Sequence, residues 1–215
     1  MLSAKASSPR VPTRSGTDVA SGEAPNGQTP IDEEEAAGLR LHIRTREALH
    51  RAEETNIVRA LLWAERSRIV RQNLLTDAAL KRIHREMFRG VWTWAGTYRV
   101  TDRNIGLAWP QITEAVRQLC GNFAYRVSLG TEESDRLAVE FQHQIVSIHP
   151  FPNGNGRHAR FCADRLIENL GGAAFAWGRV DLQVRGQARD RYLEALRAAD
   201  RGDLEALVAF ARSDK

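Results

Sequence analysis

The sequence predicts a mainly α-helical fold with one short β element and a disordered N-terminal tail. From about residue 45 onward, apolar residues recur at three- and four-residue spacing, which is the period of an amphipathic helix. Residues 97–107 break this period with a weak alternation that predicts a β-hairpin, or flap. Residues 1–36 are rich in Ser, Pro, Gly and Thr and contain no aromatic residue, so they cannot bury enough apolar surface to fold. We therefore expect a tail over 1–36 and one domain over 37–215.

The expected helices follow one another along the domain. Asp77 is the expected cap of the second and Ser134 of the fourth, and Gly171 with Gly172 is expected to end the fifth. The apolar positions of the seven helices lie within residues 57–64, 80–87, 112–123, 137–148, 162–170, 192–199 and 204–211.

Composition excludes several classes of protein. The 215 residues are 42% hydrophobic and 27% charged, and no run of 18 apolar residues exists, so no membrane partner is expected. The two cysteines, Cys120 and Cys162, are isolated, which disfavours a zinc ribbon or a disulfide scaffold and fits a reducing cytoplasm. The net charge of +4 is dispersed, and no helix-turn-helix spacing or basic stripe occurs. Specific nucleic-acid binding is therefore not expected.

The stretch that indicates chemistry is residues 149–160, between the fourth and fifth expected helices. Gly154 and Gly156 allow the backbone to approach a ligand closely. The loop leads into a helix N-terminus, where free N–H groups and the helix dipole attract anions. Arg157 and Arg160 are three residues apart, so we expect their guanidinium groups on one face of that helix. Two such groups beside an anion site suit a di- or triphosphate.

Three further residues of this loop have expected roles. His149 stands where the preceding helix ends and is a candidate general base, because histidine can exchange a proton near neutral pH. Phe151 is apolar among polar neighbours and is expected to anchor the loop in the core. Asn153 could turn the chain or offer an oxygen to a metal ion.

The stretch HPFPNGNGRHAR also resembles the signature H-x-F-x-D/E-G-N-G-R-x-x-R of the Fic/Doc (Fido) domain family. Residues 91–99 resemble the segment that leads into the family's flap, and residues 202–211 resemble its C-terminal end, so the resemblance spans about residues 40–212. TPIDEEE near the start and the form of the motif resemble the subgroup called mobile mystery protein B. The seven matching positions of the signature are His149, Phe151, Gly154, Asn155, Gly156, Arg157 and Arg160.

The resemblance implies a helical fold and transfer of part of a nucleotide, most often AMP from ATP with Mg²⁺, to a Ser, Thr or Tyr hydroxyl of a target protein. His149 would deprotonate the hydroxyl, and backbone N–H groups of Gly154, Asn155 and Gly156 would hold the phosphates. Arg157 and Arg160 would bind the β- and γ-phosphates. An antitoxin or another regulatory partner is also implied. The flap would align the target by strand-like pairing through Arg99, Val100, Thr101, Asn104 and Ile105.

The sequence departs from the family at Asn153, where an Asp or Glu usually holds Mg²⁺. A neutral amide binds this hard cation more weakly than a carboxylate does. Weaker metal binding, an altered donor with transfer of UMP, phosphocholine or a γ-phosphate as in relatives, and a catalytically silent interaction module all stay open.

The family's inhibitory pattern S/T-x-x-x-E-G/N, whose Glu would pair with Arg160, is matched in part at Thr29–Glu33 and at Ser128–Glu132. Glu53 or Glu54 is a looser alternative.

Overall fold

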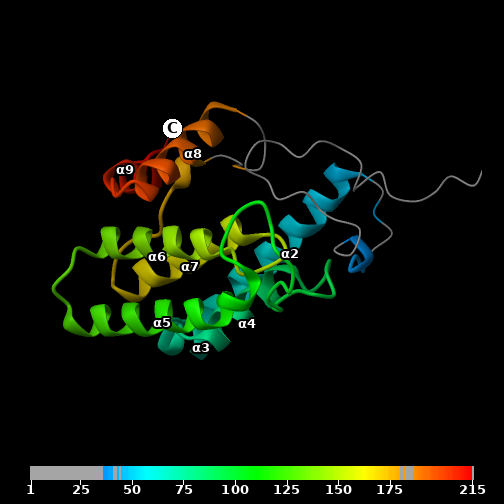
Figure 1. The fold of residues 1–215 in the computed structure, drawn as a ribbon, viewed down its shortest axis with the longest axis horizontal. Helices are drawn as coiled ribbons and strands as arrows, with labels where there is room; N and C mark the ends of the chain where they lie inside the picture. Colours follow the sequence, from blue (N-terminus) through cyan, green and yellow to red (C-terminus); the bar gives the residue numbers. More distant parts are fainter. Residues whose placement is uncertain (1–35, 41–42, 44, 180–181, 183–185, 215) are drawn as a thin grey trace, which may run out of the picture.

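The computed structural model describes residues 36–40, 43, 45–179, 182 and 186–214, and the expected tail over 1–36 lies almost wholly outside them. The described part is mainly helical, which confirms the predicted fold class (Figure 1). Its α-helices are α2 (Arg46–Arg66), α3 (Arg68–Asn73), α4 (Asp77–Phe88), α5 (Ile112–Leu129), α6 (Ser134–Ile148), α7 (Asn155–Asn169), α8 (Gln187–Asp200) and α9 (Glu205–Arg212), with short 3₁₀ turns η1 (Trp109–Gln111) and η2 (Trp177–Arg179).

The ends of the helices differ from the prediction by a residue or more. Thr76, rather than Asp77, caps α4, because its side chain accepts a hydrogen bond from the N–H of Ala79. Glu133, rather than Ser134, caps α6 in the same way. α7 begins at Asn155, inside the glycine loop, well before its first expected apolar position. It ends as expected, with the N–H of Gly171 bonded to the carbonyl of Glu168.

The predicted β-hairpin is wrong. Residues 99–107 form no strand, and the described residues contain only an isolated bridge between Leu39 and Trp92. The flap bonds to the neighbouring loop instead of to itself: the N–H of Arg99 donates to the carbonyl of Pro150, and that of Leu107 donates to Ile148. These bonds use N–H groups that a hairpin would have paired between its own two strands.

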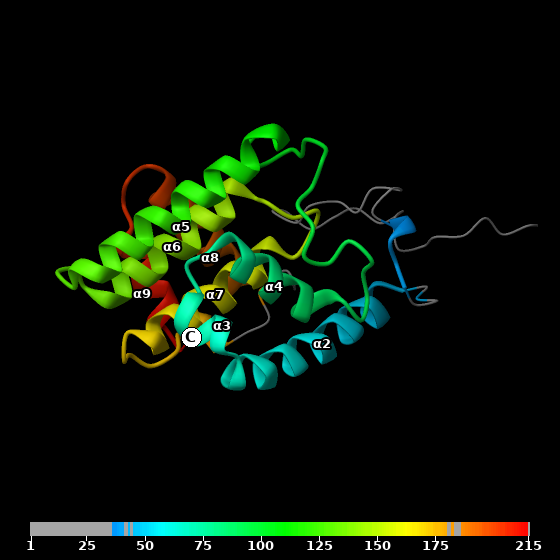
Figure 2. The same ribbon diagram turned by 90° about the horizontal axis from the view of Figure 1, so that it is seen from below.

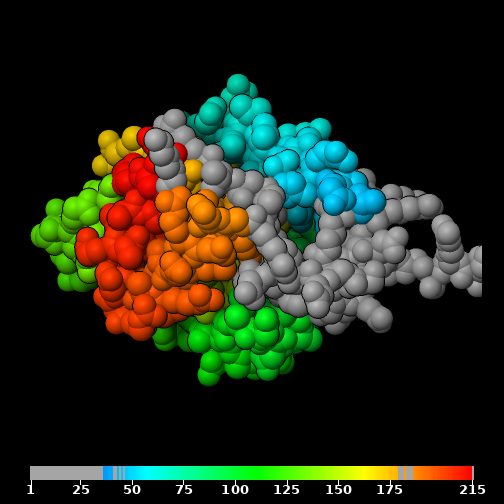
Figure 3. All heavy atoms as spheres, turned by 90° about the horizontal axis from the view of Figure 1, so that it is seen from above, coloured from blue at the N-terminus to red at the C-terminus, as the bar shows by residue number. Residues whose placement is uncertain are grey.

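The core lies between α4, α5, α6 and α7. α5 and α6 run side by side, and α7 packs against α6 and α4 (Figures 1 and 2). α2 packs along the other side of α4. α8 and α9 adjoin each other on the surface, apart from α2, as the space-filling view in Figure 3 shows. The largest fully buried side chains include Trp92, Phe88, Phe123, Phe141 and Phe151.

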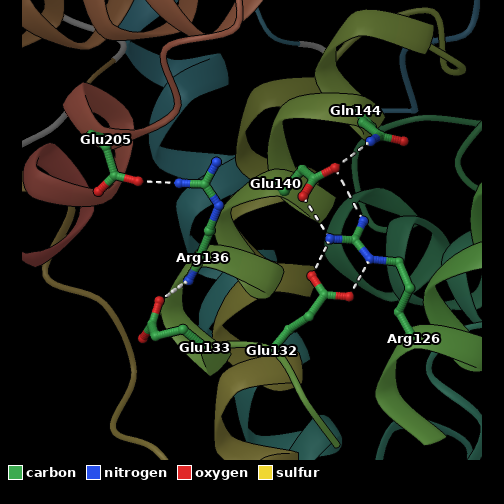
Figure 4. A network of polar contacts seen from close by, with 7 residues as sticks. All are labelled: Arg126, Glu132, Glu133, Arg136, Glu140, Gln144 and Glu205. Atoms are coloured by element: carbon green, nitrogen blue, oxygen red, sulfur yellow. Dashed lines mark hydrogen bonds and ion pairs between the residues drawn. The ribbon is translucent and has the colours of Figure 1, made fainter. Parts of the chain in front are cut away.

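Ion pairs at the α5–α6 turn hold α5 and α6 in place relative to each other (Figure 4). Arg126 near the end of α5 donates to Glu132 in the turn and, at 2.8 Å, to Glu140 on α6. Arg136 on α6 pairs with Glu205 of α9. In the described ranges, no helix is both long and apolar enough to cross a bilayer.

Candidate functional site

The glycine loop joins the end of α6 to the start of α7 through two residues in the left-handed region. His149 has φ 54° and ψ 59°, which is uncommon for a residue other than glycine. Gly154 has φ 78°, and a Cβ there would lie 2.6 Å from Cζ of Phe88. Only glycine therefore fits at position 154, where the chain enters α7 beside a buried ring.

The side chain of Asn155 holds the loop closed. Its Oδ1 accepts from the N–H of Phe151 at 2.9 Å, and its Nδ2 donates to the carbonyl of the same residue at 2.8 Å. The Phe151 ring is fully buried, which confirms the expected anchor. It stacks on the imidazole of His84 with ring centroids 3.7 Å apart. The loop is therefore fixed by its own residues and by α4.

His84 is a part of the site that the sequence did not indicate. Its Nδ1 accepts a hydrogen bond from the N–H of Gly96, so Nε2 carries the proton and donates to the carbonyl of Asn153 at 3.0 Å. Burial holds the pKa of His84 well below its usual value, and His158 lowers this pKa further. A neutral His84 thus ties the loop to α4 and to the segment before the flap. The hydrogen-bond partners of His84 lie 12 and 69 residues away in the sequence, so no local pattern could have indicated its role.

His149, the candidate base, is 6% exposed at the mouth of the loop. Burial, together with the positive charge of Arg99, lowers the pKa of His149 to about 4. The imidazole is therefore neutral near pH 7, which is the form that can accept a proton.

Arg99 lies inside the molecule rather than on the surface of the flap. Its guanidinium donates to the carbonyl of His149 at 2.7 Å, to Thr101 at 2.8 Å and to Leu107 at 2.5 Å. The expectation that Arg99 aligns a target therefore needs correction, because these three carbonyls use its donors. Of the other residues expected to dock a target, Val100, Asn104 and Ile105 are exposed and Thr101 is half-buried.

The two arginines of the motif point to different neighbours. Nη1 of Arg157 lies 2.7 Å from Oε2 of Glu53 on α2, and its guanidinium lies over the Phe88 ring. Arg160 lies over the ring of Tyr192 on α8. The expectation that both guanidinium groups share one face is wrong, because α2 and α4 flank one side of α7 while α8 flanks the other.

Glu53 does not make the pairing that an inhibitory glutamate would make with Arg160. It is buried and accepts from Arg157 and from the indole N–H of Trp92 at 2.7 Å. Glu54 pairs with His50, and Glu132 pairs with Arg126 at the α5–α6 turn. Thr29 and Glu33 lie outside the described residues.

The anion site and the metal site were expected in the same loop. No side chain caps the N-terminus of α7 in the described part of the chain, which leaves its first N–H groups for a ligand. Oδ1 of Asn153 accepts from the N–H of Gly154 at 2.7 Å. No group of three His, Cys, Asp or Glu residues able to hold a metal occurs among the described residues. A Mg²⁺ ion at this loop would therefore need oxygens of phosphate or water among its ligands.

A glycine loop that leads into the uncapped N-terminus of a central helix is an arrangement able to bind an anion. Residues 74–167 match the Fic/DOC family. Solved Fic domains also share the fold: the N-terminal Fic domain of a putative cell filamentation protein from Bartonella quintana superposes with a TM-score of 0.64 at 16% identity, covering 81% of this chain and 85% of that one. Residues 74–167 are therefore similar in sequence to the Fic/DOC family, and the chain shares the fold of solved Fic domains.

Similar curated proteins carry names of one activity. The probable protein adenylyltransferase y4lH of Sinorhizobium fredii is 29% identical over 146 residues, which is 64% of this chain and 72% of that protein. The protein adenylyltransferase VbhT of Bartonella schoenbuchensis is 30% identical over 115 residues, which is 48% of this chain. The match spans only 23% of VbhT. A Bartonella quintana Fic domain solved with bound ADP has a TM-score of 0.62 at 16% identity, covering 81% of this chain and 87% of that one.

Proposed function

We propose that this protein is a protein adenylyltransferase, which transfers AMP from ATP to a Ser, Thr or Tyr hydroxyl of a target protein. One observation carries the proposal: a buried, neutral His149 stands at the mouth of a loop that leads into the uncapped N-terminus of α7. A proton acceptor beside a phosphate site is what attack by a hydroxyl on a phosphate requires. The names of the similar curated proteins support the same activity.

The nucleotide is proposed to lie against the start of α7. Backbone N–H groups of Gly154, Asn155 and Gly156 would bind phosphate oxygens, and the half-buried Arg160 would contact the outer phosphates. Arg157 would add positive charge from behind the loop while Glu53 holds it. Mg²⁺ is written here as part of the substrate, bound to the phosphates of ATP, because Asn153 offers a neutral oxygen already bonded to Gly154.

The proposed chemistry needs one proton transfer and one displacement. Nε2 of His149 would take the proton of the target hydroxyl while the hydroxyl oxygen attacks the α-phosphorus. The bond between the α-phosphorus and the bridging oxygen breaks, and pyrophosphate leaves with its negative charge near Arg160. The resulting imidazolium then gives its proton to solvent, which regenerates neutral His149.

Five further expectations belong to this proposal. The target would dock along Val100, Thr101, Asn104 and Ile105, with Arg99 holding the flap from inside. An antitoxin or regulatory partner, a cytoplasmic location and the mobile mystery protein B subgroup stay predictions from the sequence. The domain is proposed to extend over 37–215, beyond the matched residues 74–167.

The test incubates the purified protein and a host-cell lysate with ATP, CTP, GTP or UTP labelled at the α-phosphate. We expect label from ATP on a protein band, and none with His149→Ala. His143→Ala is the matched control, because His143 lies on the same helix but pairs with Asp200, so its loss should leave labelling intact. Equal labelling by wild type and His149→Ala would overturn the proposal.

Asn153 favours a second candidate function, a catalytically silent module that keeps the loop to bind phosphate or peptide. Without a carboxylate at this position, the loop could bind a nucleotide but position its metal poorly. This candidate predicts saturable ATP binding without label transfer from any donor. An Asn153→Asp variant distinguishes the two candidate functions. A silent module should show no transfer with Asn153 and gain it with Asp, whereas an adenylyltransferase should already transfer AMP with Asn153.

A further inference from the structure

A pocket lies apart from the glycine loop, between α2, α4 and the segment that follows α4. Its volume is about 690 Å³, which is within the range of small-molecule sites. Its walls come from three parts of the chain: residue 40, residues 56–63 of α2, and residues 85–97. No residue of the glycine loop lines it. The pocket is therefore a separate place to bind a ligand.

Arginines dominate the lining. Arg40, Arg59, Arg85 and Arg89 all face this pocket, and each has an exposed side chain. Glu86 is the carboxylate in the lining, and it is engaged by Arg82 and by Arg89, both at 2.9 Å. In the described part of the chain, neither Arg59 nor Arg85 has an ion-pair partner.

The frame that holds these arginines is tightly packed. A Cβ at Gly90 would collide with the side chain of Asn56, so the segment after α4 touches α2 directly. Trp92 is 1% exposed, and Nε of Arg40 donates to its carbonyl at 3.4 Å. The indole of Trp92 is in turn bonded to Glu53. A fixed frame lowers the entropy cost of ordering the pocket around a ligand.

We propose that this pocket is an anion-binding site for a small phosphate-bearing ligand, with a diphosphate group as the shared chemistry. Guanidinium groups bind phosphate oxygens through two parallel N–H donors. Arg59 of α2 and Arg85 of α4, which have no ion-pair partner among the described residues, line this volume together with Arg40. The half-buried Trp63 adds an aromatic wall on which a base could stack. The site is independent of the proposed AMP transfer, since it shares no residue with the glycine loop.

The test is a titration of the full-length ¹⁵N-labelled protein, followed by amide and indole resonances at constant ionic strength. Inorganic pyrophosphate and ADP are the two probes. Gly90, Thr93 and Thr97 report this pocket, while Gly154 and Gly156 report the glycine loop, so binding at either place is seen separately. We expect saturable shifts at the pocket with both probes. A larger shift of the Trp63 indole with ADP would indicate a nucleotide, and equal shifts would indicate the diphosphate alone.

Variants decide whether the arginines cause the binding. The double substitution Arg59→Gln with Arg85→Gln should weaken pyrophosphate binding at the pocket about tenfold or more. Both side chains are exposed, so the fold should persist, and the spectrum itself checks this. Arg71→Gln is the matched control, an exposed arginine on α3 outside the pocket. Shifts that never saturate, shifts confined to the glycine loop, or equal weakening by Arg71→Gln would each overturn the proposal.

Discussion

The glycine loop and the flap lie against each other, but they are held in different ways. Residues within the loop bond to one another, as Asn155 does to Phe151, and its aromatic anchor is fully buried. The flap donates one backbone bond to Pro150 of the loop and one to Ile148 at the end of α6, and its one buried side chain, Arg99, bonds to Thr101 and Leu107. Its outer residues Val100 and Ile105 are 62% and 41% exposed.

The difference separates two tasks that the proposed reaction needs. A site that holds phosphates and a proton acceptor requires fixed geometry, which dense packing and satisfied hydrogen bonds provide. A surface that meets a protein target requires exposed groups, and segments with few buried contacts open at lower free-energy cost. Arg99 joins the two, because its guanidinium bonds to the carbonyl of His149 and to the flap carbonyl of Leu107.

The largest expected effect comes from removing the anchor of the loop. Phe151→Ala should lower the free energy of unfolding by about 3–5 kcal/mol, because it leaves a cavity between His84 and Tyr98. Urea unfolding measures this change. Phe151→Leu fills most of the cavity and should cost less than half as much. Equal stability of the alanine variant and wild type would contradict the rigid-loop interpretation.

The second largest expected effect comes from removing Arg99, which connects the glycine loop and the flap. Arg99→Ala should cost about 2–3 kcal/mol, because one buried and two partly buried carbonyls lose a charged donor. Hydrogen exchange should also quicken at the N–H of Leu107, which bonds to Ile148. Asn104→Ala, on the exposed part of the flap, is the control and should change neither property. Unchanged exchange at Leu107 in Arg99→Ala would show that the two backbone bonds suffice.

Lowering the pH should destabilise the packing around the glycine loop. Burial lowers the pKa of both His149 and His158 to about 4, from 6.5. The unfolded chain therefore binds more protons between these values, so stability is full above pH 6.5 and falls as the pH drops toward 4. Between pH 7 and pH 5 each histidine should cost about 2 kcal/mol.

Asp164 acts in the opposite direction, because burial raises its pKa to about 6. Its proton uptake in the folded state should offset about 1 kcal/mol of this loss. The difference between the free energies of unfolding in urea at pH 7 and pH 5 measures the net change, and imidazole resonances of His149 and His158 report the individual pKa values. Imidazoles that titrate near 6.5 in the folded protein would be inconsistent with the burial described.

The smallest stability effect should come from the outer flap. Ile105→Ser should change the free energy of unfolding by less than about 0.5 kcal/mol, because the side chain is already exposed. Labelling of the target protein should nevertheless fall. Leu129→Ser is the matched control, because Leu129 is also an exposed apolar residue but lies at the end of α5, outside the flap. Target labelling that falls equally in both variants would remove the flap from the docking surface.

Local patterns were enough to predict most helices and the loop. The three- and four-residue spacing over 112–123 and 137–148 lies within α5 and α6 because each of those helices buries one apolar face. The short α3 was missed, since its six residues bury only Val70. The hairpin prediction was wrong because weak alternation cannot reveal that Arg99 and Leu107 bond to another loop.

The sequence by itself determined the helical class and the position of the glycine loop, because helix period and glycine conformation depend on neighbouring residues alone. Tertiary structure decided the rest of the site. It brought Glu53 to Arg157 and His84 to Asn153, and it gathered Arg59, Arg85 and Arg40 around one pocket. Burial also set the pKa of His149. These features depend on which helix faces meet, and packing of distant segments fixes that only in the folded chain.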